Sequence, residues 1–268
     1  MTKIIAITNQ KGGVGKTTTS INLASSLAAC KKKTLLIDLD PQGNATMGCG
    51  INKNEQDYTV YDVLIGDTGF EDILTKASYN ANLDIAPSNE NLTAAEVELL
   101  NLPEKEYCLS RKLASIKDAY AYIIIDCPPT LNMLTVNALS AADSVIIPAQ
   151  CEYYALEGLS ALINTLNKIK QASNPSLEIE GILRTMYDPR NSLTRDVSTQ
   201  LLNHFGDRVY QTTIPRNVRL AEAPSHGLPV LYYDKSSSGS MAYLALAGEI
   251  LRLEKSRKKT KEATTDLV

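Results

Sequence analysis

The sequence predicts an α/β fold with a mostly parallel central sheet and helices on both faces of the sheet. Short apolar runs alternate with segments of helical periodicity along the 268 residues, which is the pattern of repeated strand–helix units. The run at residues 34–38 is apolar on both faces, as expected of a strand that is covered on both sides. A glycine-rich turn joins the first apolar run to the first helical segment, so we expect a ligand-binding loop there.

The predicted elements follow one another in a regular order. Residues 4–7 form the first apolar run, and the apolar side chains of Ile21, Ala24 and Leu27 then share one face of a helix. A second clear helical pattern covers residues 156–170. The remaining strands are predicted at residues 34–38, 83–86, 122–126, 144–148, 179–185 and 211–214.

We expect a single domain, residues 1–253, followed by a charged tail, residues 254–268. With 44% hydrophobic residues the chain can bury a large core, and it contains no internal repeat and no long linker. The tail opens with a run of Glu, Lys and Arg side chains, which favours a solvated, disordered end. It lacks bulky apolar residues opposite its lysines, so a membrane-surface helix is not expected.

The composition excludes several classes of protein. The five cysteines form no Cys-x-x-Cys pair and there are only two histidines, so a disulfide framework or a zinc site is not expected. The sequence has no apolar run long enough to span a membrane and no signal-peptide pattern, which predicts a cytoplasmic protein. Because the net charge is −3, any binding to nucleic acid needs a local basic surface.

The segment 11–18 has the composition and context of a phosphate-binding loop. It follows the first predicted strand and opens the first helix, and its glycines allow several backbone N–H groups to point into one concavity. The helix N-terminus adds partial positive charge. We expect Lys16 to reach the β- and γ-phosphates and the Thr17 hydroxyl to ligate Mg²⁺. The predicted nucleotide-binding residues of the loop are Lys11, Gly12, Gly13, Val14, Gly15, Lys16, Thr17 and Thr18.

Three aspartates follow predicted strands. Asp38 and Asp40 lie at and just after the end of strand 34–38, and Asp126 ends strand 122–126. Ligands in open α/β sheets bind beyond the carboxyl ends of the strands, so all three carboxylates can approach the phosphates. A carboxylate there can hold Mg²⁺ directly or through water, or orient an attacking water molecule. Asp40 and Asp126 are the stronger candidates, because Asp38 could serve only to order its loop.

The loop departs from the common pattern G-x-x-x-x-G-K-[ST]. Its first glycine position holds Gln10, and an additional lysine, Lys11, follows. This arrangement resembles the deviant P-loop, K-G-G-x-x-K-[ST], of the family that includes the ParA/Soj partitioning ATPases, the division-site ATPase MinD and nitrogenase iron protein. The strings at residues 8–18, 38–46, 150–158 and 214–227 look like chromosomal ParA/Soj, and the resemblance extends over residues 3–252. It implies a P-loop NTPase-like fold.

The resemblance also implies a function. In such ATPases, Mg²⁺ and ATP drive a sandwich homodimer in which Lys11 would cross to the phosphates of the partner. Asp40 would position the attacking water and Asp126 would support Mg²⁺ and its water shell. Pro215 and Asn217 correspond to residues near the adenine. The ATP state would bind double-stranded DNA without sequence preference, and a ParB-type partner would stimulate a slow intrinsic hydrolysis, so we expect a protein associated with the nucleoid.

The segment 184–219 is the one candidate for a basic surface. It contains six arginines, no lysine and three aspartates, which leaves a local excess of three positive charges. Arginine suits phosphate contact because its planar group presents several donors. Arg190 and Arg219 match family positions credited with DNA contact, and Arg216 lies between them. The alternative is a set of solvated arginines with one structural ion pair.

Three other functions stay open. A MinD-like ATPase would act on a membrane, a scaffold-positioning relative would act on a protein cluster, and a metabolic ATPase of the same fold would depend on a small-molecule substrate. The cysteines do not fit an iron–sulfur reductase. The predicted first strand starts at Lys3, so no operator-binding domain is expected before it. The sequence leaves open a chromosomal or plasmid origin, the partner protein and any role in replication initiation.

Overall fold

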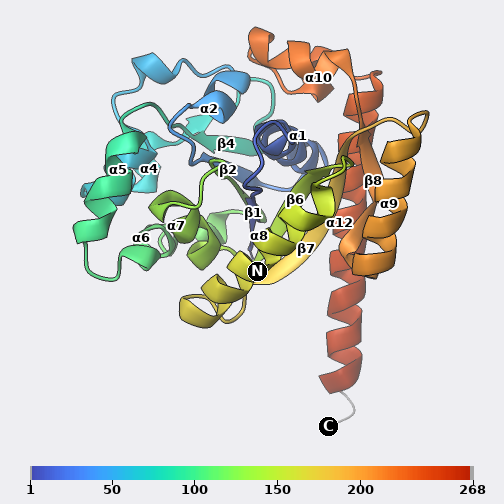
Figure 1. Ribbon diagram of the computed structural model, residues 1–268. Coiled ribbons are helices and arrows are strands. Elements are labelled where there is room, and N and C mark those ends of the chain that lie inside the picture. Colours follow the sequence, from blue (N-terminus) through green and yellow to red (C-terminus); the bar gives the residue numbers. More distant parts are fainter. Residues whose placement is uncertain (1, 266–268) are drawn as a thin grey trace.

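The computed structural model describes residues 2–265, and the side chains of residues 2–257 (Figure 1). Within this part of the chain, strands form one sheet in the order β3-β4-β2-β5-β1-β6-β7-β8, and every pair is parallel except β3–β4. The strands are β1 (Lys3–Ile7), β2 (Thr34–Asp38), β3 (Thr75–Lys76), β4 (Leu83–Ala86), β5 (Tyr122–Asp126), β6 (Ser144–Gln150), β7 (Glu178–Tyr187) and β8 (Val209–Pro215).

Helices cover both faces of the sheet (Figure 1). Helices α1, α11 and α12 pack on one face, and α3 to α9 pack on the other. The helices are α1 (Lys16–Ala29), α2 (Asn44–Gly48), α3 (Val60–Ile65), α4 (Phe70–Ile73), α5 (Leu92–Glu98), α6 (Cys108–Leu113), α7 (Met133–Ala141), α8 (Ala155–Ala172), α9 (Ser192–Phe205), α10 (Val218–Glu222), α11 (Val230–Tyr233) and α12 (Ser238–Thr265). Short 3₁₀ turns join several of them, at Lys53–Glu55, Leu99–Asn101, Lys105–Tyr107, Lys117–Ala119, Gly206–Arg208 and Ala223–His226.

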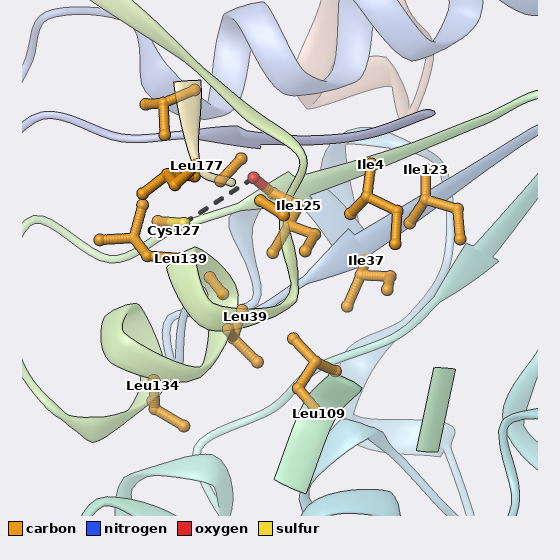
Figure 2. Close-up of a cluster of buried hydrophobic side chains, with 14 of the residues drawn as sticks. Ile4, Ile37, Leu39, Leu109, Ile123, Ile125, Cys127, Leu134, Leu139 and Leu177 are labelled. Atoms are coloured by element: carbon orange, nitrogen blue, oxygen red, sulfur yellow. Dashed lines mark hydrogen bonds between the residues drawn. The ribbon is translucent and has the colours of Figure 1, made fainter. Parts of the chain in front are cut away.

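The central strands are apolar on both faces because each face has its own hydrophobic core. In β5, Ile123 and Ile125 enter the core under α6 and α7, whereas Tyr122 and Ile124 enter the core under α1 and α12. Successive side chains of a strand point to opposite faces, so an unbroken apolar run fills both cores. Figure 2 shows the first core, to which strands contribute side chains such as Ile37 and Ile123 and helices contribute side chains such as Leu109 and Leu134.

The pairing register of the three central strands prepares the site. Strand β5 lies between β1 and β2, and Asp126 at its end pairs with Ile7 on one side and Asp38 on the other. The chain leaves β1 through a loop into α1 and re-enters the sheet at β2, on the far side of β5. The carboxyl ends of β1, β5 and β2 therefore meet directly beside that loop.

The predicted fold class is confirmed, because the sheet is mostly parallel and has helices on both faces. The sequence did not predict β3, a strand of two residues that pairs antiparallel to β4 at the edge of the sheet. A strand this short has no periodicity that a sequence pattern could reveal. Strand β7, Glu178–Tyr187, is longer than the predicted range 179–185.

The C-terminal segment differs from the prediction of a tail that starts at Glu254. Helix α12 continues to Thr265, and its part around Glu254 is anchored to the sheet. The Tyr122 hydroxyl donates to Glu254, and Arg257 Nη1 lies 3.0 Å from Glu180 Oε1, a buried carboxylate that Lys3 also contacts at 2.8 Å. These contacts extend the ordered domain into the charged run. Residues 266–268 of the predicted tail lie outside the described residues.

Two glycines should respond oppositely to replacement by alanine. A Cβ at Gly181 in β7 would overlap the ring of Tyr210, whereas a Cβ at the exposed Gly158 in α8 would meet nothing within 4 Å. We expect Gly181→Ala to lower the free energy of unfolding by about 1–3 kcal/mol through overpacking. Gly158→Ala should raise it by about 1 kcal/mol, because alanine favours a helix. Urea unfolding of both variants checks this, and equal shifts in their midpoints would contradict the packing at β7.

Candidate nucleotide-binding site

The loop between β1 and α1 has an open, left-handed backbone path. Gly13 has φ of +73° and Gly15, the N-cap of α1, has φ of +88°, values that side chains other than glycine rarely adopt. A Cβ added at Gly12 or Gly13 would meet no atom within 4 Å. Crowding by the protein is therefore not the reason for these glycines, and the space in front of them is free for a ligand that approaches the backbone closely.

The two lysines of the loop point to different partners. Lys16 is buried, and its Nζ donates to the carbonyl oxygen of Lys11 at 3.1 Å. Burial lowers the pKa of Lys16, and the carboxylates of Asp126 and Asp40 oppose this shift. Lys11 is half-exposed, and its Nζ lies 2.5 Å from Glu152 Oε2, just before α8. One ammonium group is thus held inside the loop, while the other is directed away from it.

The three predicted carboxylates lie together under the loop, and all are buried. Asp126 Oδ1 accepts a hydrogen bond of 2.7 Å from Ser20 Oγ of α1. Burial and the neighbouring Asp38 raise the pKa of Asp126 to about 8. Burial likewise raises the pKa of Asp38 to about 6, although hydrogen bonds from Thr46 lower it. Two buried carboxyl groups side by side create a demand for positive charge at this point.

The residues present fit a Mg²⁺ ion that arrives with a phosphate ligand. Asp126 Oδ2 is buried and has no hydrogen-bond partner among the described residues, and Thr17 lies close enough to lower the pKa of the same carboxyl group. Hydroxyl and carboxylate oxygens with water are the ligands that Mg²⁺ prefers. In the described part of the chain, no cluster of three or more His, Cys, Asp or Glu side chains could hold a metal by itself. A nucleotide phosphate would have to complete the coordination.

A cavity of about 180 Å³ adjoins the loop and contains both residues predicted near the adenine, Pro215 and Asn217. Gly15 and Thr18 form its wall on the side of the loop, and apolar side chains make up much of the remainder. The other lining residues are Thr185, Met186, Ile214, Arg216, Leu220, Ala221 and Tyr243. Its size and apolar character suit the flat ring of a base. A separate cavity of about 400 Å³, between α8, β7 and α12, contains none of the predicted site residues.

Two residues that line this cavity, Thr185 and Met186, were not predicted from the sequence as site residues. The Thr185 hydroxyl donates to the carbonyl oxygen of Val14 at 2.8 Å, so the end of β7 braces the phosphate loop. Met186 has φ of +49°, a strained conformation for a side chain of this kind, and it lies against the cavity. Ser20 was also missed, although it lies one helical turn after Lys16, and that spacing could have indicated it. Thr185 gave no local signal because it reaches the loop only through the sheet.

All three arginines predicted to contact DNA are exposed, and two of them are paired with carboxylates of their own chain. Arg190 contacts Asp188 at 2.8 Å, and Arg219 contacts Glu222 at 2.8 Å and Asp234 at 3.3 Å. Arg216 is exposed and lines the 180 Å³ cavity. Its position therefore also suits contact with a nucleotide bound in that cavity, in addition to the predicted contact with DNA.

Arg184 does not belong to a surface. It is buried and donates to Ser198 Oγ and to the carbonyl oxygen of Tyr210, both at 2.8 Å. The charge excess predicted for residues 184–219 therefore overstates the positive charge that is exposed.

Comparison with known proteins agrees with this geometry. The model of a family described as an AAA domain matches residues 2–179. The sporulation initiation inhibitor protein Soj of Bacillus subtilis is 54% identical over 93% of this chain and 98% of its own length. The chain belongs to the ParA/Soj family of chromosome-partitioning ATPases. The chromosome partitioning protein ParA of Caulobacter vibrioides is 49% identical over 95% of this chain and 96% of its own length.

Solved structures place this ParA/Soj family member among proteins crystallised with nucleotide. A structure titled cobyrinic acid a,c-diamide synthase from Mycobacterium smegmatis, with bound ADP and magnesium, has a TM-score of 0.84 and 36% identity over 96% of both chains. The whole P-loop ATPase fold is therefore shared, and the similarity is not confined to the loop. None of the helices in the described part of the chain is long and apolar enough to cross a membrane.

The raised pKa of Asp126 predicts a stability that depends on pH. Between 3.8 and about 8 the folded protein keeps a proton on this carboxyl group that the unfolded chain has released. The free energy of unfolding therefore falls as pH rises through this window. Asp126→Asn removes the effect and keeps an oxygen for Ser20, so it should stabilise the nucleotide-free protein by about 1 kcal/mol or more at pH near 8.

The stabilisation by Asp126→Asn should be smaller near pH 5, where the wild-type carboxyl group still holds its proton. Chemical denaturation of both proteins at the two pH values measures the difference. A stabilisation that is the same at both would show that Asp126 titrates normally in the folded state.

Proposed function

We propose that this chain is a Mg²⁺-dependent ATPase that dimerises in its ATP state, binds DNA without sequence preference and partitions DNA together with a ParB-type protein. The observation that carries the proposal is the division between the two loop lysines. Lys16 is buried in its own loop, whereas Lys11 is half-exposed and directed outward to Glu152. A single active site needs only the first of them. The second, once it leaves Glu152, would be available to act on a nucleotide bound to another copy.

Within one copy, each element has a defined task in converting ATP and water to ADP and phosphate. The backbone N–H groups of the glycine-rich loop and Lys16 bind the phosphates, and the 180 Å³ cavity at Pro215 and Asn217 receives the base. Mg²⁺ would be held by Thr17 and, through water, by Asp126, and would neutralise phosphate charge. Asp40 accepts a hydrogen bond from the Gln42 N–H at 2.9 Å, and its carboxylate orients the attacking water.

Dimerisation would link ATP to DNA. Arg190 and Arg219 are exposed, but their own carboxylates already neutralise part of their charge, so one copy would bind DNA weakly. Two copies held together double the contacts, and the effective local concentration of the second site raises the affinity without any new contact. A slow intrinsic hydrolysis suits a timing device, and a ParB-type partner would shorten the bound state. The protein would then lie in the cytoplasm, associated with the nucleoid.

The direct test is binding to random-sequence duplex DNA at about 0.1 M salt, with ATP, with ADP and without nucleotide. We expect binding with ATP only. Arg219→Glu should weaken that binding at least 10-fold while ATP-driven dimerisation persists, because it reverses one charge in each copy. Arg111→Glu, a matched change at an exposed, ion-paired arginine of α6, should leave DNA binding unaltered. Binding that is independent of nucleotide would contradict the proposed switch.

Asp40→Ala should separate binding from turnover. We expect this variant to bind ATP, to dimerise and to stay on DNA, while phosphate release falls by about 100-fold or more, because the attacking water loses its orienting group. Single-turnover hydrolysis and DNA release after ATP is chased with ADP measure the two effects. Hydrolysis at the wild-type rate would remove Asp40 from the reaction.

A metabolic ATPase is the second candidate, favoured by the 36% identity to the structure titled cobyrinic acid a,c-diamide synthase. The relatives named for chromosome partitioning are more similar, at 49% and 54% identity, which favours partitioning. A metabolic enzyme would hydrolyse ATP only when its small-molecule substrate, such as a carboxylic acid, is present, and DNA would not change its rate. If neither DNA nor such an acid affects turnover, sedimentation with liposomes and ATP tests the MinD-like alternative, and a protein scaffold is then the remaining surface.

A further inference from the structure

Four buried residues form a closed ring of hydrogen bonds around the strand end that carries Asp40. The Asp40 N–H donates to Asp38 Oδ1 at 3.2 Å, and Asp38 Oδ2 accepts from the Thr46 hydroxyl at 2.7 Å and from the Thr46 N–H at 2.8 Å. The same Thr46 hydroxyl accepts from the Ser88 N–H at 2.9 Å. The Ser88 hydroxyl donates to the carbonyl oxygen of Asp40 at 2.9 Å and closes the ring.

Three segments that are distant in sequence supply the ring. Asp38 and Asp40 follow β2, Thr46 belongs to α2, and Ser88 follows β4, the neighbour of β2 in the sheet. Thr46 and Ser88 have no exposed surface, so neither hydroxyl is available to a ligand. Their hydroxyl groups instead form hydrogen bonds with the Asp38 carboxylate and with the backbone carbonyl of Asp40.

The turn after Asp40 is equally constrained. The Gly43 N–H donates to the Asp40 carbonyl oxygen at 2.9 Å, and Gly43 has φ of +63°. A Cβ at Gly43 would come within 2.8 Å of the Ser88 carbonyl oxygen, so Ser88 also limits what this turn can hold. The Asp40 side chain itself takes no part in the ring, and its Oδ1 accepts from Gln42. The ring therefore fixes the backbone of Asp40 and leaves its carboxylate to face the site.

We propose that Thr46 and Ser88 are positioning residues for Asp40, which hold its carboxylate at the place from which it orients the attacking water. The inference rests on the proposed function, in which Asp40 performs that task. A displacement of about 1 Å in a group that positions a reactant can cost on the order of 100-fold in rate. Nucleotide affinity resides in the glycine-rich loop and the base cavity, which share no hydrogen bond of the ring.

The Thr46 hydroxyl can be removed with little change of shape. Thr46→Val should lower kcat for ATP hydrolysis by about 10- to 100-fold, with the affinity for a non-hydrolysable ATP analogue unchanged. Thr46→Ser retains the hydroxyl and should restore most of the rate. Thr34→Val is the matched control, because Thr34 is also buried, lies at the opposite end of β2 and donates one hydrogen bond of 2.9 Å to the Lys32 carbonyl oxygen. It should leave kcat unchanged.

A double-mutant cycle with Asp40 separates positioning from general damage. Ser88→Ala should slow hydrolysis in the wild-type background and have no further effect in the Asp40→Ala background, where the ring persists because it uses only backbone atoms of Asp40. This variant also keeps the proposal testable if Thr46→Val fails to fold. Wild-type kcat in both Thr46→Val and Ser88→Ala would overturn the positioning role, as would a loss of analogue binding that equals the loss of rate.

The roles of Asp40 and of the hydrogen-bond ring can be tested separately. If Asp40→Ala hydrolyses ATP at the wild-type rate, the proposed role of Asp40 is wrong, and the positioning proposal is overturned with it. If Asp40→Ala is inactive but Thr46→Val and Ser88→Ala are not impaired, the role of Asp40 stands and the ring serves stability alone. Unfolding midpoints of all variants show whether a change of rate reflects lost structure.

Discussion

The site depends on the pairing register of β1, β5 and β2, which aligns the carboxyl ends of these three strands at one edge of the sheet. Because Asp38 pairs with Asp126 across β2 and β5, two carboxyl groups are buried side by side beneath the loop that follows β1. Burial and repulsion from Asp38 raise the pKa of Asp126 to about 8, so this carboxyl group keeps its proton over a pH range in which an exposed aspartate is ionised. A phosphate-bound divalent ion satisfies this arrangement, and the Lys16 ammonium group alone does not.

The elements around this pair of carboxyl groups have separate roles. The open glycine path would receive phosphates, Thr185 braces it from β7, and the ring through Thr46 and Ser88 holds the segment that ends at Asp40. The surface that would meet DNA lies outside this rigid frame. Arg190 and Arg219 are paired with carboxylates of their own chain, which DNA phosphates would have to displace, so the proposed DNA binding would be weak for one copy and stronger for two.

The sequence predicted the parts whose signal is local. The strand–glycine–helix pattern located the phosphate loop, and the apolar runs ending in Asp38 and Asp126 located the acidic edge of the sheet. It could not predict Ser88 or Thr185, because their tasks arise from the order of strands and not from neighbouring residues. The sequence analysis counted Arg184 among the surface arginines. A sequence does not show that this side chain is buried and donates its hydrogen bonds to Ser198 and to the Tyr210 carbonyl oxygen. Helix α12 continues past Glu254 because Tyr122 and Glu180 lie within its reach.

The most direct test of the account is calorimetric titration of the purified protein with ATP, in the presence of Mg²⁺ and in the presence of EDTA. We expect one site per chain with clearly higher affinity when Mg²⁺ is present, and loss of that binding in Lys16→Ala. Lys53→Ala serves as a control, because Lys53 lies near the Asp40 turn without touching the phosphate loop. Equal affinity with Mg²⁺ and with EDTA, or binding that survives in Lys16→Ala, would contradict the assignment of the loop and of the buried carboxyl pair as a Mg²⁺–ATP site.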